Sequence, residues 1–72
     1  MPPSVPHISG AETVRALEKL GFAQVRQKGS HVVMRRGSSG CVVPMHRELK
    51  IGTLSGILKQ AGLTVDDLTQ AL

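Results

Sequence analysis

The residues best suited to chemistry lie between positions 27 and 36. This run combines a turn signal, one imidazole and three cationic side chains: Lys28, Gly29, Ser30, His31, Arg35 and Arg36. Because an imidazole changes its charge near neutral pH, His31 is a candidate general base or proton shuttle. It could take the proton from a ribose 2′-hydroxyl and set that oxygen against the adjacent phosphorus. Such a reaction needs no metal ion.

The neighbours of His31 supply what the transfer of a phosphoryl group requires. Lys28, Arg35 and the amides of Gly29 and Ser30 could stabilise negative charge on the phosphoryl oxygens, and the glycine lets backbone approach a substrate. Arg35 and Arg36 would then hold the flanking backbone of a nucleic acid. The alternative is a strand histidine that is exposed and has no catalytic role, since no acid partner is evident.

Other polar residues give weaker signals. His46 is either an acid partner for His31 or a loop residue bonded to local backbone. Lys50 and Thr53 could bind a phosphate at the start of a helix, or Thr53 could only cap that helix. Cys41 lies in an apolar run and is expected to be a small buried side chain. No metal site is expected, because the Cys and His residues lack the spacing of metal ligands.

The charge is concentrated in the middle of the chain. The formal net charge is +4, and residues 26–50 hold six Lys or Arg against Glu48 alone, so their net charge is 6 − 1 = +5. This favours a polyanionic partner, with a solvated charged face as the alternative. The chain has no Tyr or Trp, which argues against stacking of bases on aromatic rings and favours contacts to backbone and shape.

The length of 72 residues allows one small domain. Residues 9–72 are expected to form it, after a flexible proline-rich tail at residues 1–8. Cys41 is the single cysteine, so no intrachain disulfide can form. We find no signal peptide and no apolar run that could span a bilayer. A cytoplasmic location without membrane contact is therefore expected.

The hydrophobic pattern predicts an α+β fold in the order αβββα with a terminal helical turn. A capping box, Ser9 with Glu12, starts a first helix at Gly10. Strands are expected at residues 23–27, 31–36 and 41–43, with a hairpin loop at residues 37–40. A second helix should run from about Gly52 or Thr53 to Ala61, and a short helix should follow Thr64. The three-stranded antiparallel sheet would carry the helices on one face and present His31 on the other.

Residues 57–68 also have the rhythm of a helix-turn-helix, which would make the chain a DNA-binding regulator. The second helix of that unit offers Asp66 and Asp67 and no cation, so phosphate repulsion opposes this function.

Three blocks of sequence are typical of a known family. They are Leu20-Gly21-Phe22, then residues 27–31 (Gln-Lys-Gly-Ser-His), and then Val43-Pro44 with His46, residues 48–54 and residues 57–63. With these blocks in this order, residues 9–70 resemble the HicA family of small bacterial toxins. In that family Val32 often has a histidine as its counterpart, so a single imidazole is expected to act here.

This resemblance implies a fold like that of double-stranded-RNA-binding domains. It also implies an endoribonuclease that cleaves mRNA without a metal, with His31 at the position of the family's catalytic histidine. A HicB-type antitoxin would neutralise the toxin by covering that histidine, and DNA would be contacted only through the antitoxin. A non-catalytic RNA-binding module on the same fold is the alternative.

Overall fold

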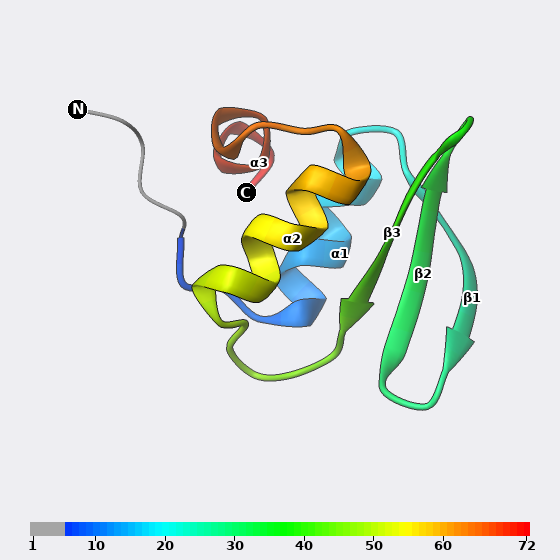
Figure 1. The fold of residues 1–72 in the computed structure, drawn as a ribbon, viewed down its shortest axis with the longest axis horizontal. Coiled ribbons are helices and arrows are strands. Elements are labelled where there is room, and N and C mark those ends of the chain that lie inside the picture. Colours follow the sequence, from blue (N-terminus) through cyan, green and yellow to red (C-terminus); the bar gives the residue numbers. More distant parts are fainter. Residues whose placement is uncertain (1–5) are drawn as a thin grey trace.

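The computed structural model describes residues 6–72 as three helices beside a three-stranded antiparallel sheet. The elements follow one another as α1 (Gly10–Lys19), β1 (Ala23–Lys28), β2 (His31–Arg36), β3 (Ser39–Pro44), α2 (Ile51–Ala61) and α3 (Val65–Ala71). The strand order is β1-β2-β3, and the helices lie on one side of the molecule with the sheet on the other (Figure 1). The predicted α+β class and the predicted sheet are confirmed.

Local signals set the ends of α1. The Ser9 hydroxyl accepts from the amide of Glu12 and the Glu12 carboxylate accepts from the amide of Ser9, so the predicted capping box is present. At the other end Gly21 has φ +96°, and the amide of Phe22 donates to the carbonyl of Leu17. This glycine and the hydrophobic residue after it close the helix and turn the chain towards β1.

Both hairpins turn on two residues that begin with glycine. Lys28 pairs with His31 across Gly29 and Ser30, and Arg36 pairs with Ser39 across Gly37 and Ser38. Each of the two glycines has φ +59°, as the first position of a type II′ turn requires. The predicted loop at residues 37–40 is therefore too long, because the tight turn at Gly37 lets Ser39 and Gly40 join β3.

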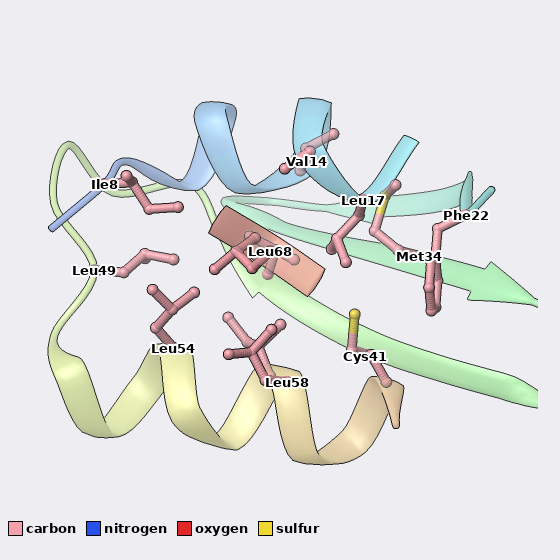
Figure 2. Packing of buried hydrophobic residues seen from close by; sticks show 14 of the residues in the cluster. Ile8, Val14, Leu17, Phe22, Met34, Cys41, Leu49, Leu54, Leu58 and Leu68 are labelled. Carbon is pink, nitrogen blue, oxygen red and sulfur yellow. The ribbon is translucent and has the colours of Figure 1, made fainter. Parts of the chain in front are cut away.

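The helices and one face of the sheet enclose a single hydrophobic core. Its central side chains are almost fully buried and come from every element except β1: Leu17, Val32, Met34, Val43, Leu49, Leu54 and Leu68. Leu68 lies between α1 and α2, while Met34 and Cys41 reach the core from the strands (Figure 2). No aromatic side chain except Phe22 takes part, so branched and sulfur-containing side chains fill the space.

The segment before α1 is joined to the loop before α2. Ile8 is 7% exposed and belongs to the core, and its carbonyl accepts from the amide of Leu49 at 2.8 Å. Of the flexible tail expected at residues 1–8, residues 1–5 lie outside the described part of the chain. Its last residue, Ile8, packs beside Leu49 at one end of the core (Figure 2).

Two features of α2 differ from the prediction. The helix begins at Ile51, with Lys50 as its N-cap residue and no side-chain cap, so Thr53 is not a cap. Gly62 closes it in the left-handed conformation at φ +71°, as predicted. Over residues 6–72, no helix combines the length and the hydrophobicity that crossing a bilayer requires.

Candidate active site

Strand β2 divides its side chains between two environments. Val32 and Met34 are 2% and 0% exposed and face the helices, whereas His31 and Arg35 are exposed on the opposite side. The alternation of side chains along a strand explains this split. We call the side away from the helices the outer face; it holds His31, Val33 and Arg35 with their paired residues Ala23, Arg26, Lys28, Gly40, Val42 and Pro44.

His31 is the first residue of β2 and follows the turn directly. Its partner on the neighbouring strand β1 is Lys28. The two side chains therefore share the outer face, with their Cβ atoms about 5 Å apart. The turn residues Gly29 and Ser30 are exposed, and a Cβ on Gly29 would meet nothing within 4 Å. No atom of the described residues therefore packs against Gly29 where a side chain would project.

Arg35 shares the outer face with His31 but lies further along the same strand. Arg35 is four positions after His31, which corresponds to about 13 Å along the strand. Arg35 pairs with Gly40, and a Cβ on Gly40 would meet the Arg35 Cγ at 3.4 Å and its Nε at 3.9 Å. The Arg35 side chain therefore lies across β3, away from the imidazole.

Arg36 is on the other face of the sheet. Its Nη1 donates to the carbonyl of Leu20 at 2.8 Å, and its guanidinium carbon lies 4.8 Å from the centre of the Phe22 ring. Grouping Arg36 with Arg35 as an RNA contact thus ignored strand alternation. In the structure Arg36 holds β2 to the end of α1 and does not join the surface around His31.

Lys50 and Thr53 are exposed but stand apart from His31. They belong to the start of α2, which lies at the opposite side of the molecule from the turn between β1 and β2 (Figure 1). A phosphate bound by Lys50 or Thr53 would therefore be a different one from the phosphate beside His31.

His46 follows β3, whose last residue, Pro44, pairs with His31. The carbonyl of His46 accepts from the amide of Gly10 at 2.9 Å, which fixes its backbone at the start of α1. Within residues 6–72, no hydrogen bond joins the imidazole of His46 to that of His31. The structure thus gives His46 an anchoring role through its backbone.

Arg26 is a cation of the outer face that the sequence prediction did not include in the site. It pairs with Val33, two residues from His31, after an irregularity between Gln24 and Arg26. The signal was available, because Arg26 and Lys28 are two positions apart on one strand and so share a face.

The strands themselves carry no carboxylate to oppose the positive charge of the outer face. Residues 23–44 contain four Lys or Arg and no Asp or Glu. In the described part of the chain, the one ion pair is His7 with Glu48 at 3.1 Å, and it does not involve the strands. A polyanion approaching the outer face would therefore meet cations that have no competing internal partner.

Cys41 is a core residue and not part of the outer face. Cys41 is 3% exposed, and burial raises the pKa of its thiol, as expected for a small core side chain. Among residues 6–72, no three His, Cys, Asp or Glu side chains cluster as metal ligands would.

The helix pair that suggested a DNA-binding regulator is present but has the wrong charge. Gly62 turns the chain from α2 into α3, and Thr64 and Asp67 form the predicted capping box. Asp66 is exposed on α3, which carries no Lys or Arg. Phosphate repulsion would oppose the docking of this helix into a DNA groove.

The fold and this surface define a small basic α+β domain with an imidazole at a glycine turn. The chain belongs to the HicA toxin family: the family model described as the HicA toxin of bacterial toxin-antitoxin matches residues 10–63, more than half of the chain. It is therefore a toxin of a toxin-antitoxin system, and an antitoxin is its partner. No curated protein sequence matches the chain significantly.

Proposed function

We propose that this toxin is an endoribonuclease that cleaves mRNA at a phosphate held between His31 and Lys28. The observation that carries the proposal is the pairing of these two residues on the outer face, beside the open turn at Gly29. Support also comes from the cationic sheet, which contains no carboxylate.

In the proposed reaction, His31 accepts the proton of the ribose 2′-hydroxyl. The 2′-oxygen bonds to the adjacent phosphorus, and the bond from phosphorus to the 5′-oxygen of the next nucleotide breaks. The leaving oxygen takes up a proton, so the products are a 2′,3′-cyclic phosphate and a free 5′-hydroxyl. Lys28 and the amides of Gly29 and Ser30 stabilise the negative charge that develops on the phosphoryl oxygens. This scheme requires no metal ion.

Binding of the RNA backbone involves the remaining cations of the outer face. Arg26 would contact the strand near the scissile phosphate, Arg35 would contact it further along β2, and Lys50 and Thr53 would contact a more distant phosphate. A HicB-type antitoxin would inhibit the toxin by covering His31. The half-buried Val33 beside it offers an apolar contact for such a partner.

The experiment is cleavage of a defined RNA by the purified chain and by His31→Ala. General acid–base catalysis contributes about 10²- to 10⁴-fold, so the variant should lose at least 10²-fold in rate. A 2′-deoxy nucleotide at the cleaved position should also block the reaction, because it removes the attacking oxygen. A folded His31→Ala protein that cuts the RNA at the original rate would refute the catalytic role.

A non-catalytic RNA-binding module is the second candidate. The observation that favours it is that His31 makes no hydrogen bond to another ionisable side chain within residues 6–72. It predicts retention of RNA by the wild-type chain with no cleavage products.

A further inference from the structure

The free edge of β3 borders a shallow hollow that the proposed reaction does not use. The hollow has a volume of about 420 Å³ and lies where β2, β3 and the end of α2 meet. Its lining residues are Val33, Arg35, Ser38, Gly40, Cys41, Val42 and Gln60. It therefore adjoins the outer face but begins two residues beyond His31.

The hollow combines an apolar floor with polar groups at its rim. Val33 and Val42 are paired neighbours on the outer face, and Val42 is 42% exposed. The polar residues that line the hollow are Arg35, Gln60 and Ser38. An apolar surface with a few polar groups around it is typical of a site for a flat, partly polar ligand.

Gly40 determines where the Arg35 side chain lies. A Cβ at this position would sit 3.3 Å from the carbonyl oxygen of Met34 and 3.4 Å from the Arg35 Cγ, closer than side chains normally pack. The stem of Arg35 therefore lies directly over Gly40 on β3, in the space that a side chain at this position would share. The guanidinium is thereby carried to the hollow and away from the phosphate site at Lys28 and His31.

We propose that this hollow binds the base of one unpaired nucleotide of the RNA and that Arg35 selects guanine there. The proposal extends the proposed function and rests on it, since it makes RNA the ligand of the outer face. Arg35 then reads a base instead of holding backbone. The base lies along the strand from the cleaved bond, because about 13 Å of β2 separates Arg35 from His31.

Hydrogen-bond chemistry favours guanine. A guanidinium has donors only, arranged as a fork, and guanine presents two adjacent acceptors, O6 and N7, that match it. Adenine and cytosine place an amino donor at the corresponding edge, which would oppose the donors of Arg35. Val33 and Val42 would contact the face of the base. In many RNA-binding proteins Tyr or Trp has this role, but the chain contains neither.

The charge of the sheet favours RNA over a peptide strand as the occupant. The strands carry four cations and no carboxylate, and the hollow continues the surface that holds the scissile phosphate. Successive nucleotides of one strand can therefore occupy the phosphate site and the hollow together.

The test is equilibrium binding of His31→Ala, which should cut RNA at least 10²-fold more slowly than the wild type, to short uridine oligonucleotides with one central G, A, C or U. We expect the G oligonucleotide to bind about tenfold more tightly than the others. Inosine keeps O6 and N7 and should retain the advantage, whereas 7-deazaguanine lacks N7 and should lose most of it. Equal affinities for all four bases would overturn the proposal.

The variants separate base reading from charge. Arg35→Lys keeps the charge but loses the fork, so it should abolish the preference for guanine; Arg26→Lys, on the same face, should keep it. Gln60→Ala should weaken the preference, and Gln70→Ala, exposed on α3, serves as its control. Retention of the full preference by Arg35→Lys would also overturn the proposal.

The outcomes distinguish this site from the nuclease activity. If the wild-type protein cuts RNA but binding shows no base preference, the proposed nuclease function stands and the base-binding role of the hollow is refuted. A protein that prefers guanine but produces no cleavage products retains the hollow and loses the nuclease.

Discussion

The two faces of the sheet are built from the same strands but have opposite character. The face towards the helices carries Val32, Met34 and Val43, each at most 2% exposed. The outer face carries His31 and three of the four cations of the strands. The comparison shows that one set of alternate residues fixes the fold and leaves the other set free for chemistry. Substitutions on the two faces should therefore have different consequences.

The largest loss of stability should follow Met34→Ala. Met34 is 0% exposed, and truncation of such a side chain usually destabilises a domain by about 2–5 kcal/mol. The adjacent Arg35→Ala, on the outer face, should change the free energy of unfolding by no more than about 0.5 kcal/mol. Urea denaturation of both variants measures the difference. Equal losses would show that the outer face also supports the fold.

Two helical glycines test how closely each surface is packed. A Cβ on Gly10 would overlap the carbonyl oxygen of Pro44, whereas a Cβ on Gly56 would meet nothing within 4 Å. Gly10→Ala should destabilise the chain by about 1–3 kcal/mol through this clash. Gly56→Ala should stabilise it by about 0.5–1 kcal/mol through its higher helix propensity. Thermal unfolding of the two variants should show shifts of opposite sign.

Two arginines on opposite faces should separate stability from RNA binding. Arg36→Ala loses the contact with Phe22 and the bond to Leu20, so the free energy of unfolding should fall by about 1 kcal/mol. Arg26→Ala should leave stability unchanged. The dependence of RNA affinity on salt should weaken by about 0.7 in log–log slope for Arg26→Ala. A comparable change in that slope for Arg36→Ala would contradict the assignment of the faces.

The smallest effect on stability should come from lowering the pH, and it should arise at the capping boxes of the helices and not at the strands. Hydrogen bonds with Ser9 and Thr64 lower the pKa of Glu12 and Asp67 in the two capping boxes. Since the folded pKa is the lower one, their contribution is present above the ordinary carboxyl pKa and is lost as the pH falls through the folded value. The Tm difference between wild type and a Glu12→Gln, Asp67→Asn double variant, which has no carboxylate in either capping box, should therefore shrink on acidification. A constant difference would mean that the carboxylates contribute nothing.

Most of the fold could be predicted because its signals are local. Both capping boxes, the glycines that end α1 and α2, and the alternation along β2 are each contained in a few neighbouring residues. The position of Ile8 could not be predicted, because its bond to Leu49 joins segments far apart in the chain. The first residue of β3 depends on whether the turn uses two residues or four. The sequence Gly37-Ser38-Ser39-Gly40 is compatible with both lengths.

The candidate site was predictable in part for the same reason. Strand alternation correctly placed His31 and Arg35 on one face. The same rule, applied to every cation of the strands, would have added Arg26 to the predicted site and removed Arg36 from it. The course of the Arg35 side chain across Gly40 depends on a pairing between β2 and β3 whose register required the structure. Sequence spacing alone could not reveal the hollow beside Gln60.

The segment between β3 and α2 links the turn beside His31 to the beginning of the folded chain. The amide of Met45 donates to the carbonyl of Ser30, the carbonyl of His46 accepts from Gly10, and the amide of Leu49 donates to Ile8. A change that displaces Ile8 would break its bond to Leu49, which belongs to the same segment as the contact with Ser30. An affinity tag for functional work therefore belongs after Leu72, whose side chain is 46% exposed.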